Sequence, residues 1–202
     1  MIEPTLIGYF ARPTLKKANW PKSDRVVEIA SASTCMSDCQ WDWINEWRHN
    51  DLWVFDSPDL AFGVVPEDKR ASCDLYAYRM FPIRFVEGRT EEFAIPPVEP
   101  TPLDASFEML GFDIVSRYCG NCFECSPLSC NGLAEVVPTN RYCLLERLED
   151  ALALAPTWEA DGKTGPEPGP YYIVEIWRRR REDYGRIECM EDGLSNSYKG
   201  HN

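Results

Sequence analysis

The sequence predicts an α+β protein built as a single domain, with a mixed or mainly antiparallel sheet of about six or seven strands and three or four short helices. Three observations point to this class. Strand-length apolar runs and amphipathic segments follow one another without the regular strand–helix–strand order of a parallel sheet. The 202 residues are enough for one core. Hydrophobic residues make up 44% of the chain, which is typical of a globular domain.

The first half of the chain contains several runs with strand character. A long alternation over 74–85 predicts one long strand, in which Pro82 marks an edge or a bulge because proline cannot donate to a ladder. Residues 92–95 are expected to pair with it. Shorter runs rich in β-branched and aromatic residues predict further strands at 6–11, 26–30 and 52–55.

Two helices are predicted in the same half. Residues 38–47 place three tryptophans on one face of an amphipathic helix, which is more typical of a core than of a binding surface. The run 56–59 provides a cap, a proline for the first turn and an acidic residue, so a short helix is expected from Pro58 to about Val65.

Four prolines in residues 96–102 predict an extended connector over the surface of one domain, which would comprise residues 1–184. Beyond it the pattern predicts helical turns at 104–110 and strands at 112–115 and 142–145. A helix at 148–155 should end at Pro156. Residues 171–177 are apolar on both faces and should form a central strand, and 185–202 should be a flexible polar tail. No internal repeat is evident.

The charge of the chain limits its partners. The formal net charge is −12, which disfavours nucleic acid and anionic membranes and is compatible with a basic protein partner. The N-terminus shows no pattern of a secretory signal, and no apolar run in the sequence approaches membrane-spanning length. Nine cysteines, an odd number, favour a reducing compartment over a disulfide framework, so we expect a cytoplasmic protein.

The region 119–131 is the most unusual stretch of the sequence. Two overlapping C-x-x-C steps and one further cysteine could provide four thiolates for a tetrahedral zinc ion. The alternative is a loop of small, partly buried thiols. The candidate metal ligands are Cys119, Cys122, Cys125 and Cys130.

Charged residues also occur within the predicted strands. Glu175 lies in the most apolar strand, where a carboxylate needs a partner, and Arg79 lies in another strand. If they face each other, they form either a structural ion pair or part of a site. The arginine run 178–181 is expected to be a solvated strand end.

Arg12 ends the first strand, Ser33 belongs to a serine- and threonine-rich strand end, and Glu175 comes late in the chain. In outline this order resembles that of small ADP-ribosyltransferase-like domains. The resemblance implies binding of a nicotinamide dinucleotide, with Arg12, Ser33 and Glu175 as weak catalytic candidates.

Three functions therefore remain open, and the sequence does not decide whether the chain is an enzyme. The first is an acidic binding protein, such as an inhibitor or immunity-type partner of a basic protein. The second is a small nucleotide-using enzyme, and the third is a zinc-binding module.

Overall fold

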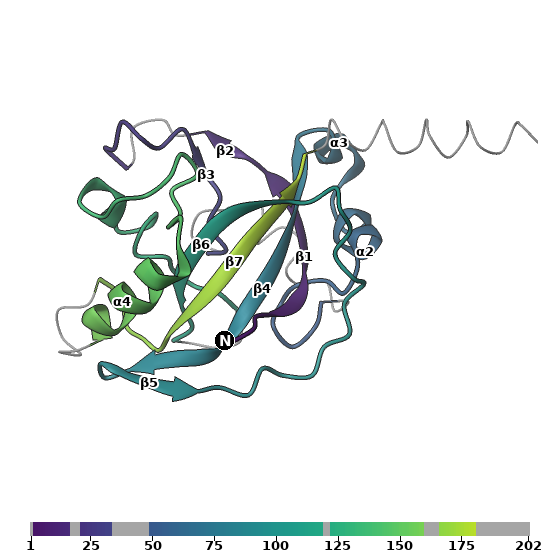
Figure 1. Cartoon of the computed structure of the whole chain (residues 1–202). Coiled ribbons are helices and arrows are strands. Elements are labelled where there is room, and N and C mark those ends of the chain that lie inside the picture. The colour runs from purple at the N-terminus through teal and green to yellow at the C-terminus, as the bar shows by residue number, and fades with distance from the viewer. Residues whose placement is uncertain (1, 17–20, 34–48, 119–121, 160–165, 181–202) are drawn as a thin grey trace, which may run out of the picture.

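The computed structural model describes residues 2–16, 21–33, 49–118, 122–159 and 166–180 (Figure 1). The predicted tryptophan helix and the predicted tail lie outside the described residues. The strands are β1 (Thr5–Pro13), β2 (Leu15–Lys16), β3 (Glu28–Ile29), β4 (Cys73–Val86), β5 (Arg89–Glu92), β6 (Glu108–Ser116) and β7 (Tyr171–Arg179). The helices are α2 (Pro58–Gly63), α3 (Glu67–Arg70), α4 (Leu148–Glu159) and a 3₁₀ turn, η2 (Leu133–Glu135).

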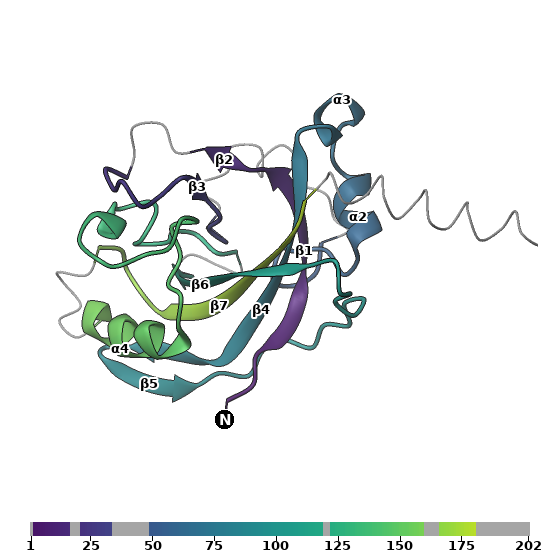
Figure 2. The same cartoon turned by 45° about the horizontal axis from the view of Figure 1, so that its top comes forward.

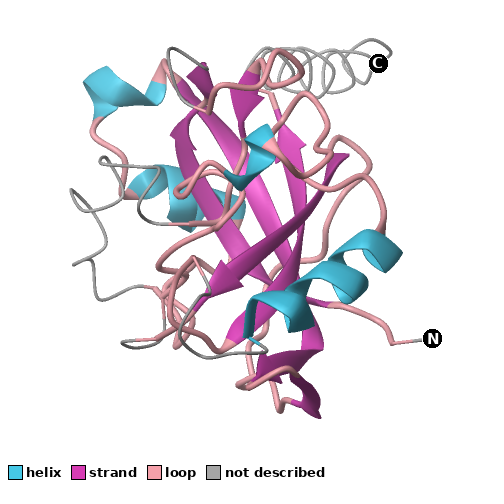
Figure 3. Ribbon diagram, turned by 90° about the vertical axis from the view of Figure 1, so that its left-hand side faces the viewer, coloured by secondary structure: helices cyan, strands magenta, loops and turns pink. Residues whose placement is uncertain are grey.

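The main sheet has five strands in the order β1-β4-β7-β6, with β5 added to β4, and every pairing is antiparallel. β2 and β3 form a separate antiparallel pair. The α+β prediction is thus confirmed. So is the central position of the strand that begins at Tyr171, because β7 lies between β4 and β6. The strands form the middle of the molecule, with the helices at its periphery (Figure 3).

Pro82 marks a bulge, one of the two outcomes that its position predicted. The register between β4 and β7 shifts between Met80 and Arg84, so Pro82 falls where the β4–β7 ladder is interrupted. Its carbonyl remains available and accepts the N–H of Phe93 at 2.9 Å. β5 spans Arg89–Glu92, so it overlaps the expected pairing segment 92–95 only at Glu92.

The sheet is strongly curved, and its two faces have different covers (Figure 2). On the convex face, Ala151 and Ala155 of α4 belong to a buried cluster with Phe112 and Ile173. On the concave face lie the segment 122–131 and β3. Phe123 packs edge-on against Tyr78 there, with ring centroids 6.3 Å apart.

The proline-rich connector does not separate two sheets, since β4 precedes it and β7 and β6 follow it in the same sheet. Residues 96–102 have no regular secondary structure. Thr101 is fixed at both backbone groups: its N–H donates to Asp56 O at 2.7 Å and its carbonyl accepts the Tyr9 hydroxyl at 2.6 Å. The connector therefore runs across the surface of one domain.

The fold contains two similar units, although the sequence shows no internal repeat. Apart from β2, β3 and α3 in the first half and η2 in the second, the order β1–loop–α2–β4 matches β6–loop–α4–β7, and the strand order places the two units symmetrically about β4 and β7 (Figure 1). In the ladders, Gly8 pairs with Tyr78 and Gly111 pairs with Ile176. Tyr78 and Ile176 also pair with each other, so a pseudo-twofold axis passes between them.

Two predicted strands, 52–55 and 142–145, are in fact matching loops that join β1 and β6 to these helical units. In each loop an asparagine, Asn50 or Asn140, accepts two backbone N–H groups through Oδ1, from the residues two and four positions later. This turn forces a positive φ at the third residue after the asparagine, Trp53 (59°) or Cys143 (63°). Three apolar residues of each loop are buried as expected of a core, but the asparagine side chain competes with strand pairing for the backbone N–H groups; the buried residues are Leu52, Val54, Phe55, Cys143, Leu144 and Leu145.

Gly8 lies opposite the Asn50 loop, and Gly111 lies opposite the Asn140 loop. Each glycine is at a register shift in the pairing of its strand. Both have φ of 144°, which favours glycine. An added Cβ on Gly8 would lie 2.7 Å from Phe55 O, and one on Gly111 would lie 2.6 Å from Leu145 O. These glycines allow the loop backbone to approach the strand closely.

Three further expectations were wrong. Residues 104–110 do not form helical turns, because Asp104 caps a short turn through Ser106 N–H at 2.8 Å and β6 begins at Glu108. α4 does not end at Pro156 but continues to Glu159. The arginine run is not a solvated strand end at its start, since Arg178 and Arg179 belong to β7 and are buried. None of the described helices is long and apolar enough to cross a bilayer.

Candidate functional site

Arg12 and Arg178 lie buried on the concave face, on either side of Tyr76. The Arg12 guanidinium carbon lies 4.3 Å from the Tyr76 ring centroid, and its Nε and Nη2 have no hydrogen-bond partner in the described part of the chain. Arg178 pairs with Glu28 Oε2 at 2.8 Å and with Glu108 Oε1 at 3.1 Å. Here the guanidinium ties together β3, β6 and β7.

Electrostatics of this cluster favour its charged state. Burial acts to raise the pKa of Glu28, but the hydrogen bond and charge of Arg178, assisted by Arg180 and Arg141, outweigh it and lower that pKa. Burial acts to lower the pKa of Arg178, yet its bonds to Glu28 and Glu108 raise it. The pair is therefore ionised at neutral pH and belongs to the structure of the fold.

Glu175 lies on the opposite, convex face. It pairs across the sheet with Arg79, with Nη1 and Oε2 at 2.9 Å, and its Oε2 also accepts Trp177 Nε1–H at 3.1 Å. Arg12 and Ser33 lie on the concave side, whereas ladder alternation directs Glu175 away from it. The structure therefore does not bring the three candidate catalytic residues together, and the Arg79–Glu175 contact has the geometry of an ion pair.

Ser33 instead meets the cysteine loop. Its Oγ lies 3.2 Å from Cys130 Sγ and donates to Glu124 O at 2.7 Å. The Cys130 sulfur also accepts Ser126 N–H at 3.4 Å and is hydrogen-bonded to Cys125. The hydrogen bond from Cys125 is the main reason that the pKa of Cys130 falls from 9.0 to about 6, and the serine contacts add to it although burial opposes them. The lowered pKa favours the thiolate form of this sulfur.

Beneath the thiols lies Asp113, a fully buried carboxylic acid on β6. Ser31 Oγ donates to it at 2.7 Å and Ser126 Oγ at 2.6 Å, and Ala32 N–H donates at 2.9 Å. Burial raises the pKa of Asp113, and these donors only partly offset the effect. Asp113 thereby connects the 31–33 segment to the cysteine loop.

The zinc ligand set is only partly placed. Cys119 lies outside the described residues, and Cys122, Cys125 and Cys130 are not joined by disulfides. Within the described ranges, no three Cys, His, Asp or Glu side chains are arranged to hold a metal ion. Two of the candidates, Cys125 and Cys130, do meet. The four-cysteine zinc site stays a prediction.

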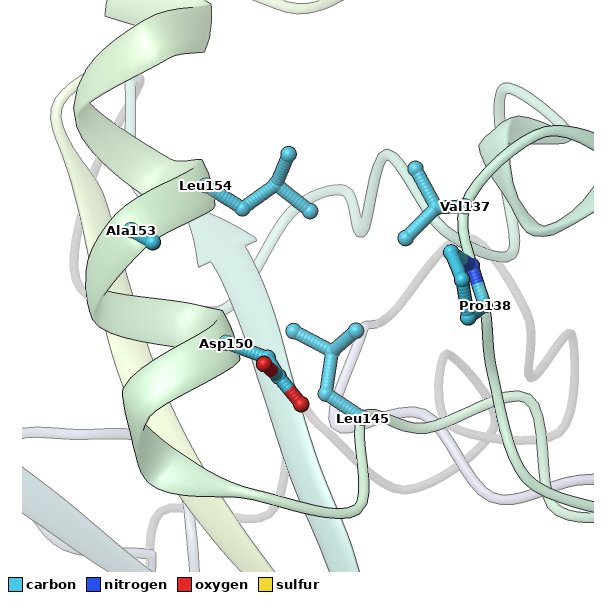
Figure 4. Close-up of a pocket in the computed structure, with 6 residues that line it drawn as sticks. All are labelled: Val137, Pro138, Leu145, Asp150, Ala153 and Leu154. Atoms are coloured by element: carbon cyan, nitrogen blue, oxygen red, sulfur yellow. The ribbon is translucent and has the colours of Figure 1, made fainter.

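A second feature lies on the outside of the molecule, where α4 faces the segment after η2. A groove of about 300 Å³ opens between them, and Figure 4 shows Leu154, Leu145 and Val137 directed toward one another across it. The groove is lined by Val137, Pro138, Leu145, Asp150, Ala153 and Leu154. Five of these six residues are apolar, so the groove can receive an apolar side chain.

The surroundings of this groove are acidic. Asp150 supplies a carboxylate to its wall (Figure 4), and exposed Glu146, Glu149 and Glu135 lie on the flanking segments. Arg147 pairs with Glu149 at 3.3 Å, but this exposed pair is weak. Next to the groove, Val136 is 77% exposed, which is unusual for a large aliphatic residue.

Searches against known protein families, characterised proteins and solved structures found no match to this chain.

Sequence reasoning missed Asp113 and the groove. Asp113 lies in the apolar run 112–115, just as Glu175 lies in the apolar run 171–177. An acidic residue in such a run indicates a buried carboxyl that needs partners, so the sequence pointed to Asp113 as clearly as to Glu175. The groove had no comparable signal, because its two walls come together only when the loop at Asn140 folds.

Proposed function

We propose that the chain is an acidic binding protein that holds a basic protein partner at the groove between α4 and residues 136–138. The observation that carries the proposal is an apolar groove with a carboxylate in its wall and an exposed valine beside it. Such a surface suits a partner segment that places an aliphatic side chain next to lysine or arginine. An inhibitor or immunity-type role is one form of this function.

The apolar contribution comes from burial of the partner's side chain. Burying one leucine-sized side chain stabilises a complex by about 1.5–3 kcal/mol, and Val136 would add to the buried area. The groove holds one or two side chains, so it would provide an anchor within a larger contact and not the whole interface.

The charge contribution favours a basic partner over an acidic or neutral one. Among the described residues, four arginines are buried but only three carboxylates (Arg12, Arg117, Arg178, Arg179, Glu28, Asp113, Glu175). Burial therefore leaves the rest of the chain slightly more acidic than the net charge of −12 indicates. This excess would speed encounter with a cationic partner at low salt.

The test compares two surface variants at matching positions of the two halves. Ala153→Arg fills the groove with a positive side chain, whereas Gly63→Arg changes the matching position of α2, where nothing lies within 4 Å of the new Cβ. Each immobilised protein is incubated with native-source lysate at low and at physiological salt.

Capture of one basic protein by wild type and by Gly63→Arg, but at least tenfold less by Ala153→Arg, supports the proposal. Weaker capture at the higher salt is also expected. Equal capture by all three proteins, or a bound protein that is itself acidic, would contradict it.

A further inference from the structure

We propose that the chain binds a small ammonium compound with an apolar body, in a cavity between the start of β1 and the end of β5. The cavity has a volume of about 500 Å³. It is lined by Ile2, Pro82, Ile83, Glu92, Phe93 and Ala94, and it shares no lining residue with the groove beside α4. The proposal is therefore independent of the binding function proposed above and concerns a different class of ligand.

The cavity lies at a gap in the sheet. β1 and β5 pair with β4 on the same side, because β7 takes the other side. β1 begins opposite Met80 and β5 ends opposite Ile83, so Phe81 and Pro82 have no paired residue in either strand. Pro82 also lacks the N–H that a paired strand would need. The gap leaves room beside β4 that neither neighbouring strand fills.

Contacts on both sides of the gap hold the walls of this cavity in place. Phe93 N–H donates to Pro82 O at 2.9 Å, and the Phe93 ring packs edge-on against Tyr172 with ring centroids 5.0 Å apart. On the β1 side, Arg79 Nη2 donates to Pro4 O at 3.2 Å and so holds the segment before β1. A cavity with fixed walls loses little conformational entropy when a ligand enters.

The lining of the cavity determines the class of ligand. Five of the six lining residues are apolar, and Ile83 among them is buried, so an apolar ligand body is favoured. The sixth residue, Glu92, is exposed and makes no hydrogen bond or ion pair with any residue that the structure describes. The volume falls within the range of roughly 300–1,000 Å³ that is typical of small-molecule sites. Because chain bounds the gap at both ends, the cavity suits one small molecule better than an extended segment.

Two arginines lie near the cavity, but neither is paired with Glu92. Arg84 pairs with Glu91 at 2.9 Å. The guanidinium carbon of Arg117 lies 5.9 Å from the centroid of the Phe93 ring, yet Arg117 is not among the lining residues. Glu92 therefore supplies the charge of the cavity wall, and an ammonium group is its complement.

The test titrates the ¹⁵N-labelled full chain with tryptamine and follows the backbone amide shifts by NMR. Tryptophol has the same indole body with a hydroxyl in place of the amine, and indole-3-acetate carries a carboxylate instead. Tryptamine should shift the amides of Ile83, Glu92 and Ala94 and should bind about threefold more tightly than tryptophol. Indole-3-acetate should bind more weakly than either.

Variants separate the apolar contribution from the charged one. Ala94→Trp fills the cavity from an exposed position and should weaken the binding of tryptamine and of tryptophol about tenfold. Glu92→Gln should remove only the preference for tryptamine. Glu91→Gln is the matched control, because this neighbouring carboxylate is already paired with Arg84, and it should bind as wild type does. Ala153→Arg, which fills the groove beside α4, should also bind as wild type does.

Equal affinity for tryptamine and indole-3-acetate would overturn the proposal, as would a preference for tryptamine that survives Glu92→Gln. So would the absence of shifts at the three amides with about 10 mM tryptamine, or loss of binding in Ala153→Arg. Shifts of the same amides that depend on protein concentration without any ligand would assign the cavity to a second copy of the chain, and would also overturn it.

Discussion

In the first half of the sheet, β1 carries Phe10 two residues after its glycine, whereas β6 carries Asp113 at the matching position. Met80 of β4 likewise corresponds to Arg178 of β7, and Leu60 of α2 to Asp150 of α4. The backbone features do not differ: each half keeps the bulge glycine, the asparagine loop and the positive φ. Both halves thus have the glycine and the asparagine that the backbone conformation requires. The side chains around these residues differ, and only the second half has the buried Asp113, the cysteine loop and the acidic groove.

The largest effect is expected where both halves depend on glycine. Gly8→Ala and Gly111→Ala each place a Cβ under 3 Å from a loop carbonyl at a φ that favours glycine. Each should lower the free energy of unfolding by about 4 kcal/mol or prevent folding. Urea unfolding measures this.

Gly63→Ala is the control for the glycine variants, since nothing lies within 4 Å of its new Cβ. Its effect should stay within about 1 kcal/mol, because Gly63 lies in the last turn of a helix. If either strand glycine tolerates alanine as well as Gly63 does, the two loops are not packed as described.

Arg178→Met gives β7 the residue that β4 has at the matching position. It leaves Glu28 buried without its main partner and should cost about 3 kcal/mol at pH 7. The pKa of Glu28 is lowered in the folded protein, so its stabilising contribution is present above its usual value of 4.5 and is lost as the pH falls through the folded value. The difference between wild type and variant should shrink below about pH 4.5.

Arg84→Met is the matched control for that variant, because its ion pair with Glu91 is exposed on both sides. Its effect should be within about 0.5 kcal/mol. An equal loss for both arginines would show that burial of Arg178 is unimportant.

The asparagine loops should show the next largest effect. Asn50→Ala and Asn140→Ala each remove an acceptor for two backbone N–H groups and a donor to a strand carbonyl, at a cost of about 2 kcal/mol. Asn50→Asp should cost more than Asn140→Asp, since only Asn50 donates to a carboxylate, that of Asp56 at 2.9 Å.

Thermal unfolding of the four asparagine variants checks both statements. A neutral Asn140→Ala would argue that the second loop is held by its apolar side chains alone.

The smallest effect is expected at Asp113, whose hydrogen bonds to Ser31 and Ser126 have no counterpart at Phe10 in the first half. Asp113→Asn should change stability by only about 1 kcal/mol at pH 7. Because burial raises the folded pKa of Asp113, the carboxyl stabilises most below its usual value of 3.8 and loses this contribution as the pH rises through the folded value. Wild type should therefore gain stability over the variant as the pH falls. A pH-independent difference would mean that the carboxyl does not titrate as described.

Local sequence patterns predicted a strand correctly where the backbone of that segment is free to pair with a neighbouring strand. The alternation of 74–85 became β4, the apolar run at 171–177 became the centre of the sheet, and Ser57 and Pro58 began a helix as their residue types require. The runs 52–55 and 142–145 failed because an asparagine upstream takes over their N–H groups. Composition identifies the apolar residues but not this competition.

The candidate sites were predicted less well. The sequence identified Cys125 and Cys130 as part of an unusual loop, but it could not show that their sulfurs meet or that Ser33 joins them from 97 positions earlier than Cys130. It also grouped Glu175 with Arg12 and Ser33, although strand alternation directs Glu175 to the other face. The groove beside α4 forms between this helix and residues 137–138. The distance between these two segments in space cannot be predicted from the local sequence of either one.

By itself the sequence determined the class of fold, the acidic character of the chain and the central strand, because hydrophobic periodicity and charge are properties of short segments. Only the tertiary structure decided that the chain contains two equivalent units about one pseudo-twofold axis, which arginines are buried, and which thiols meet. These features arise from contacts between segments far apart in the chain, where geometry and not composition selects the partner.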